Sequence, residues 1–186
     1  STQGTVDYKA SLIWEAGDNT QVNYDVQRKN TASGTFASIA TPASTNYTDS
    51  TITWNNTYWY RVFAINSDGT SYGSNIRKIT YTNTPPSIDI PNVISVEESS
   101  SFVTGFRPSD ADGHSLTLTL GSQSPGNDAS DFTLASNGDL SFNTSPDYEN
   151  PADYDGNNIY DLKLTANDGI ESVSQDFSVV VLNVSD

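Results

Sequence analysis

The stretch Leu-Thr-Leu-Thr-Leu at residues 116–120 alternates apolar and polar side chains with a period of two. This is the period of a β-strand with one buried face, because successive strand side chains point to opposite faces. Similar stretches, rich in β-branched and aromatic residues and separated by Asn, Asp, Gly, Ser or Pro, occur at residues 11–14, 24–28, 58–64, 160–164 and 177–181. No segment shows a convincing apolar period of about 3.6 over a helical length. About seven strands in each roughly 80–100 residues predict an all-β chain of two β-sandwiches in tandem.

The sequence Tyr-Thr-Asn-Thr-Pro-Pro at residues 81–86 separates the two expected sandwiches. The strand-like pattern stops there, two prolines stiffen the chain, and the charge balance changes on the far side. We therefore predict two domains, residues 1–82 and residues 83–186.

The acidic charge of the chain belongs to the second domain. Residues 1–82 hold six basic and six acidic side chains, whereas only Arg107 and Lys163 oppose seventeen carboxylates in residues 83–186, which therefore carry the whole formal net charge of −15. Such a surface repels nucleic-acid phosphates and anionic lipid headgroups, and no run of about 18 apolar residues occurs. We expect neither nucleic acid nor direct membrane insertion, and divalent cations are the natural partners.

The chain contains no cysteine and one histidine, His114. Disulfides, thiol nucleophiles and thiolate metal sites are therefore excluded, and His-based triads and zinc sites are disfavoured. We expect His114 to be an exposed loop residue, because calcium prefers oxygen ligands and no second His accompanies it. A serine at the first position, without a recognisable signal peptide, suggests a fragment of a longer, processed chain.

The first domain carries a recognisable aromatic pattern. Trp14 and Tyr24 lie in strand-like stretches, and Ile52 stands six places before Tyr58. With these residues the segment 5–82 resembles a fibronectin type III domain. In that family such a pair forms a tyrosine corner, whose hydroxyl bonds to the backbone upstream, although Trp54 stands here where the family usually has proline. The resemblance implies an Ig-like sandwich, and we expect it to serve as a spacer.

Four crowded aromatic residues, Trp54, Tyr58, Trp59 and Tyr60, allow two interpretations. Flat rings stack on the faces of sugars, so the first domain could be a carbohydrate-binding module of a polysaccharide-degrading enzyme. The alternative, which we favour, places Tyr58 and Tyr60 in the core while Trp59 covers the outer sheet surface, since aromatic residues mostly fill cores and cross-strand pairs.

Two pairs of carboxylates in the second domain have the spacing of a calcium-binding loop. Asp110 and Asp112 lie two residues apart and are followed by Gly113, which allows a sharp turn. Asp147 and Glu149 repeat the same spacing. Calcium takes six to eight oxygen ligands from loops that need not be rigid, so each pair can converge on one ion.

These pairs belong to a longer series of motifs that covers almost the whole second domain. In order, the motifs are Val-Glu-Glu-Ser (96–99), Ser-Asp-Ala-Asp-Gly (109–113), Pro-Asp-Tyr-Glu-Asn-Pro (146–151), Ala-Asn-Asp-Gly (166–169) and Val-Leu-Asn-Val-Ser-Asp (181–186). The segment 85–186 resembles a cadherin-type domain, in particular the cadherin-like repeats of bacterial surface and secreted proteins.

The cadherin resemblance implies calcium at two opposite poles of the second sandwich, where it locks the junctions between domains. The first pole would face the preceding domain and use Asp110, Asp112 and Asp168. Its linker, residues 81–84, offers no carboxylate, so we expect fewer or weaker ions there. The second pole would use Glu98, Asp147, Glu149 and Asp186, with Glu97 and Asn183 as neighbouring candidates.

Asp153 and Asp155 resemble the first positions of an EF-hand loop. That interpretation fails, because Asn158 and Leu164 stand where the loop needs Gly and Glu. A turn rich in Asp, Gly and Asn is the favoured reading, and support of the second ion pole is the alternative.

The sequence as a whole indicates a calcium-binding, calcium-rigidified adhesive or spacer segment. We expect it to belong to a larger secreted or surface-attached multidomain protein, of bacterial type, involved in cell or matrix adhesion. Its expected partners are calcium, the neighbouring domains of the chain, and a homophilic, protein or polysaccharide ligand. An enzyme is not expected, because the acidic pairs lie too close together within each loop for a two-carboxylate glycosidase.

Overall fold

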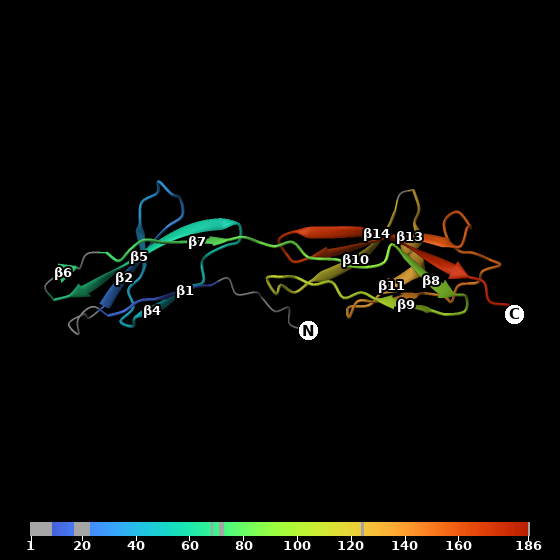
Figure 1. Ribbon diagram of the computed structural model, residues 1–186, viewed down its shortest axis with the longest axis horizontal. Helices are drawn as coiled ribbons and strands as arrows, with labels where there is room; N and C mark the ends of the chain where they lie inside the picture. Colours follow the sequence, from blue (N-terminus) through green and yellow to red (C-terminus); the bar gives the residue numbers. More distant parts are fainter. Residues whose placement is uncertain (1–8, 17–22, 68, 71–72, 124, 186) are drawn as a thin grey trace. The chain divides into compact units, whose positions relative to one another are not determined.

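The computed structural model describes residues 9–16, 23–67, 69–70, 73–123 and 125–185 (Figure 1). These residues form two compact units, which divide between Asn83 and Thr84. The fold is all-β, as expected, and within the described ranges the only helical element is a short 3₁₀ helix. No helix among these residues is long and apolar enough to cross a membrane.

The first unit consists of two sheets that enclose an aromatic core. One sheet pairs β1 with β4, and the other runs in the order β3, β2, β5, with β6 and β7 both paired to β5. The core between the sheets includes Ala10, Ile52, Tyr58 and Tyr60, all of them buried. The strands are β1 (Ala10–Ile13), β2 (Asn23–Lys29), β3 (Ala37–Ala40), β4 (Asn46–Asp49), β5 (Asn56–Asn66), β6 (Gly69–Thr70) and β7 (Arg77–Tyr81).

The tyrosine-corner bond predicted for Tyr58 is present. The N–H of Thr53 donates to the Tyr58 hydroxyl oxygen at 2.9 Å, and the neighbouring Ile52 is buried. The hydroxyl of a buried tyrosine needs a partner, and the backbone just before β5 supplies it. The bond therefore ties the start of β5 to the segment that follows β4.

The aromatic residues of β5 divide between the two faces of the sheet, as the favoured interpretation predicts. Tyr58 and Tyr60 are buried in the core. Trp59 is half-buried on the outer face, where the ammonium groups of Lys29 and Lys78 lie 5.6 and 5.9 Å from its ring. Cation–π contacts of this kind cover the ring instead of leaving it as an open platform for a sugar.

A buried carboxylate connects three strands of the first unit. Asp49, at the end of β4, accepts hydrogen bonds from Arg28 of β2 at 2.6 Å and from the Tyr60 hydroxyl of β5 at 2.8 Å. Burial alone would raise the pKa of Asp49, but hydrogen bonds from Thr51, Tyr60 and Arg28 outweigh burial and hold that pKa below its ordinary value. The charged form of Asp49 therefore stabilises the unit.

The second unit is also built from two facing sheets. One has the order β10, β13, β14, β8 and the other β11, β12, β9. β13 and β14 form a long antiparallel hairpin, whereas β14 and β8 run parallel (Figure 1). The elements are β8 (Val93–Glu97), β9 (Phe102–Gly105), β10 (Thr117–Ser122), η1 (Asp128–Asp131), β11 (Phe132–Leu134), β12 (Asp139–Phe142), β13 (Ile159–Asn167) and β14 (Ser172–Leu182).

The core of the second unit follows directly from the alternation in its sequence. In β13, Tyr160, Leu162 and Leu164 are buried, while Asp161 and Lys163 between them are exposed. Phe177 on β14 and Leu140 on β12 meet these side chains from the two sheets. The β13–β14 hairpin therefore supplies much of the core. The loops at both of its ends carry carboxylates.

Candidate metal centres

The end of the second unit where β8 and β14 finish brings together three carboxylates from two segments. Glu98 directly follows β8, and Asp147 and Glu149 lie in the loop between β12 and β13. One carboxylate oxygen of each residue lies within 4.8 Å of the others. We refer to Glu98, Asp147 and Glu149 as the Glu98 group, which assembles three of the residues expected at the second pole.

Backbone hydrogen bonds hold the Glu98 group in place. Glu98 accepts the N–H of Val184 at 2.7 Å and the N–H of Tyr148 at 3.1 Å, and these two bonds lower its pKa. Asp147 accepts the N–H of Glu149 at 3.1 Å, which forms the turn between the two carboxylates. Glu98 therefore joins β8, the β12–β13 loop and the chain just after β14, and these bonds favour its ionised form.

The donor atoms of the Glu98 group suit calcium. All three residues offer carboxylate oxygens, the donor type that calcium prefers, and they lie on loops with Asp147 and Glu149 exposed to solvent. The side-chain amide of Asn183 donates to Glu149 at 2.6 Å, so this candidate also lies beside the group. Asp186 lies outside the described residues.

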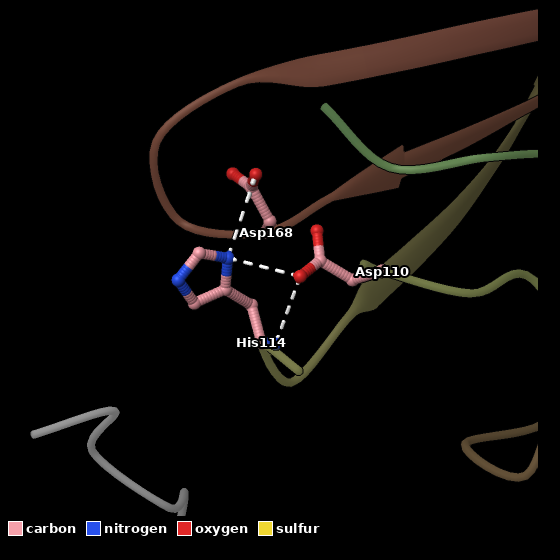
Figure 2. Close-up of side chains that lie close together, drawn as sticks. All are labelled: Asp110, His114 and Asp168. Carbon is pink, nitrogen blue, oxygen red and sulfur yellow. Dashed lines mark hydrogen bonds and ion pairs between the residues drawn. The ribbon is translucent and has the colours of Figure 1, made fainter. Parts of the chain in front are cut away.

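A second group lies at the opposite end of the β13–β14 hairpin. Figure 2 shows its three side chains. Asp110 comes from the loop between β9 and β10, and Asp168 from the turn between β13 and β14. The Nδ1 atom of His114 lies 3.1 Å from Asp110 Oδ1 and 3.9 Å from Asp168 Oδ2. We refer to Asp110, His114 and Asp168 as the His114 group.

The expectation that His114 is an exposed loop residue is wrong. Its side chain is 1 % exposed, as is that of Asp110, and that of Asp168 is fully buried. Gly113 adopts a positive φ of 79°, and the turn lets the His114 N–H donate to Asp110 Oδ1 at 2.9 Å. Figure 2 shows that the Nδ1 atom of the imidazole faces both carboxylates.

Asp112 is separate from the His114 group. It is exposed, and its Oδ2 accepts the N–H of Thr84 at 2.6 Å. Its own N–H donates to Asp110 Oδ1 at 2.9 Å. Asp112 therefore supports the loop around Asp110 and binds the first residue of the unit, while its carboxylate is not one of the three clustered donors found among the described residues.

Two buried carboxylates, Asp128 and Asp153, organise the loop before β13. Asp128, in η1, accepts the N–H groups of Tyr154 and Asp161, each at 2.8 Å. Asp153 accepts the N–H groups of Asn157 at 2.8 Å and Asn158 at 3.0 Å. Asp153 therefore forms a turn, in line with the favoured reading, whereas Asp128 carries no local motif that would have revealed its role.

The substitution Asp131→Asn is expected to stabilise the second unit at neutral pH. Burial, followed by the negative charges of Asp128 and Asp153, raises the pKa of Asp131 in the folded protein. A raised pKa means that the carboxyl contributes stability below its unfolded pKa of about 3.9 and loses it as the pH rises through the folded pKa. Because solvent screens this partly exposed carboxyl, we expect a gain of no more than about 0.5 kcal/mol at pH 7 that vanishes near pH 3, measured by calorimetry. Asp89→Asn, at an exposed site, is the charge-matched control.

The comparisons with known proteins found structural likeness only. No family model and no curated protein matches the sequence. Among solved structures, Drosophila N-cadherin EC1–3 has a TM-score of 0.48 at 17% identity, over 87% of this chain and 56% of that one. Human protocadherin-24 EC1–2 has a TM-score of 0.41 at 16% identity, over 94% and 88%. The chicken CNTN1 FN1–FN3 domains have a TM-score of 0.37 at 13% identity, over 95% and 63%. The chain spans about half the length of the N-cadherin structure.

Proposed function

We propose that this chain is a calcium-binding spacer segment of a larger secreted or surface-attached adhesive protein, of bacterial type. It combines a fibronectin type III-like unit with a cadherin-like unit, and the Glu98 group is its calcium site. The observation that carries the proposal is the convergence of three carboxylates, within 4.8 Å, at one end of the acidic unit. The cadherin-like order of motifs in the sequence supports the same assignment.

The charge of the second unit gives calcium a large effect on stability. Residues 83–186 carry the whole net charge of −15, so their carboxylates repel one another in the folded state. A cation that binds only the folded state offsets part of this repulsion and stabilises by linkage. At an ion concentration one hundred times the Kd, the gain is about 2.7 kcal/mol.

Calcium at the Glu98 group would also stiffen the unit. Glu98 already bonds to Val184 after β14 and to Tyr148 in the β12–β13 loop. An ion held jointly by Glu98, Asp147 and Glu149 adds bonds between the same segments. We therefore expect these loops to resist proteases better with calcium than without it.

The test is calorimetric unfolding of the whole chain with calcium and with a chelator. Calcium is expected to raise the Tm of the second unit by about 10 °C. The tryptophans Trp14, Trp54 and Trp59 all lie in the first unit, so their fluorescence reports that unit alone, where we expect no shift. An unchanged Tm and an unchanged rate of proteolysis on chelation would reject the proposal.

The variant Asp147→Asn tests the site directly. Asparagine keeps an acceptor oxygen for the N–H of Glu149 but removes one charge from the ion, so we expect calcium affinity to fall by roughly tenfold or more. The control is Glu97→Gln, which removes a charge from the exposed neighbour of Glu98 without touching the Glu98 group. Equal losses in the two variants would mean that only the overall charge attracts calcium.

A further inference from the structure

We propose that the outer face of the larger sheet of the first unit binds an acidic polysaccharide, one that carries carboxylate or sulfate groups along its chain. This inference does not depend on calcium at the Glu98 group, which belongs to the other unit. It assigns a ligand to a unit for which the sequence indicates a spacer role.

Three cations and three aromatic rings alternate across this face. They are Lys29 of β2, Trp59, Arg61 and Phe63 of β5, Lys78 of β7, and Phe36, which directly precedes β3. We refer to these six residues as the cation ladder. Lys29 lies opposite Trp59 in the sheet, and Trp59 lies opposite Lys78. Adjacent strands are about 4.8 Å apart, so the two lysines are attached about 10 Å apart, one on each side of the ring.

The aromatic rings hold the charged groups in place. The Lys29 ammonium lies 5.2 Å from the centre of the Phe36 ring. The Arg61 guanidinium lies 4.2 Å from the same ring and 4.9 Å from that of Phe63. Arg61 Nε also donates to the side chain of Gln27 at 2.8 Å. Because restrained side chains lose less entropy when a ligand binds, the cation ladder is a preorganised set of three positive charges.

Carboxylates of the described residues do not neutralise these charges. Within that part of the chain, none of Lys29, Arg61 and Lys78 takes part in an ion pair. The described strands of this face carry one acidic residue, Asp25, whose Oδ2 accepts the side-chain amide of Gln27. The face is therefore positive although residues 1–82 as a whole are neutral, and a positive surface attracts anions.

The chemistry of the cation ladder favours an anionic sugar chain over a neutral one. The ammonium groups of Lys29 and Lys78 cover Trp59, so its ring is not a platform on which a neutral sugar stacks. The donors on this face are the ammonium groups and a guanidinium, which can bind a carboxylate or a sulfate through two N–H groups. Three charges spread over neighbouring strands fit a linear chain with repeated anions better than a single anionic group. The acidic second unit repels such a chain, so we expect binding at the first unit alone.

The test is a calorimetric titration of the whole chain at low salt. A chelator is present so that calcium cannot link carboxylates of the protein to those of the ligand, which keeps this test separate from calcium binding at the Glu98 group. The probes are alginate oligosaccharides, which carry carboxylates, dextran sulfate, which carries sulfates, and neutral dextran as the matched control. We expect at least one anionic probe to bind and dextran not to bind. Which of the two anionic probes binds identifies the acidic group.

Salt should weaken this binding strongly. Raising NaCl from about 0.05 M to about 0.5 M is expected to lower the affinity by roughly tenfold or more, because salt screens charges on an exposed face. The proposal is overturned if neither anionic probe binds at low salt, or if dextran binds as tightly as they do.

Lys78→Gln and Arg77→Gln form a matched pair of variants. Both remove one exposed positive charge from β7, but successive strand side chains point to opposite faces, so only Lys78 belongs to the cation ladder. We expect Lys78→Gln to weaken binding by about three- to fivefold and Arg77→Gln to change it by less than about twofold. Tryptophan fluorescence on heating verifies that both variants keep the fold of the first unit. Equal losses would mean that overall charge alone attracts the polyanion, and would overturn the proposal.

Sedimentation of the chain without polysaccharide distinguishes this ligand from a second copy of the protein. The acidic unit of another chain is the other polyanion available to the cation ladder. A chain that stays monomeric at low salt while it binds the anionic probes supports the proposal. Self-association at low salt that is lost in Lys78→Gln but kept in Arg77→Gln would show that the face serves contact between chains, and would overturn it.

Discussion

Asp49→Ala is expected to lower the free energy of unfolding of the first unit by about 3–5 kcal/mol, one of the two largest effects predicted for this chain. The substitution leaves the Arg28 guanidinium, whose side chain is 15 % exposed, without the carboxylate 2.6 Å away. It also removes the acceptor of the buried Tyr60 hydroxyl. Chemical denaturation followed by tryptophan fluorescence measures the effect, because all three tryptophans belong to this unit.

The pH dependence of Asp49→Ala gives an independent check. The pKa of Asp49 is lowered in the folded protein, so its contribution is present above the unfolded pKa of about 3.9 and is lost as the pH falls through the folded pKa. The variant and the original protein should therefore become more alike in stability as the solution is acidified. Glu15→Gln, at an exposed position, should change stability by less than about 0.5 kcal/mol. If Asp49→Ala lowers the free energy of unfolding by less than about 1 kcal/mol, the hydrogen bonds of Asp49 with Arg28 and Tyr60 do not stabilise the unit as proposed.

Gly138→Ala is expected to destabilise the second unit by about 3 kcal/mol. Gly138 has a φ of 88°, and an added Cβ would lie 2.3 Å from the carbonyl oxygen of Phe106. Because the Phe106 oxygen is a backbone atom, turning a side chain cannot relieve this contact. The two backbones are also held together, since the Phe106 N–H donates to the Gly138 carbonyl at 2.8 Å. The loss is measured by calorimetry of the second unit.

Gly156→Ala is the matched control for Gly138→Ala. Gly156 also has a positive φ, of 72°, but an added Cβ there meets nothing within 4 Å. Only the conformational cost remains, which is about 1 kcal/mol. If the two variants lose equal stability, the contact between the added Cβ and the Phe106 carbonyl oxygen does not contribute to the destabilisation.

The sheets and part of the metal centres could be predicted from the sequence because they depend on local patterns. Alternation in residues 160–164 determines which side chains enter the core, independently of the conformation of the loops. The six-residue spacing of Ile52 and Tyr58 likewise predicts a hydrogen bond across one turn. Glu98 and Asp147 are far apart in the chain, and only the cadherin-like order of motifs indicated that they would meet.

The burial of His114 could not be predicted, because it depends on segments that are distant in the sequence. The residue follows Asp-Gly, a pair typical of exposed turns, yet the β13–β14 turn brings Asp168 against its imidazole. Asp128 was missed for a similar reason. Its two partners, Tyr154 and Asp161, lie more than twenty residues further along the chain, so no short motif marks it.

The parallel pairing of β14 with β8 has a mechanical consequence. β8 is the first strand of its unit and β14 the last, and they are in register from Val93 opposite Ser178 to Glu97 opposite Leu182. Tension that pulls the chain before β8 away from the chain after β14 slides the two strands past each other and loads their hydrogen bonds together in shear. An antiparallel pair at the same place would open one bond at a time from its end. The bond from Val184 to Glu98 lies across the same junction, so the Glu98 group is placed where a pulling force would first act.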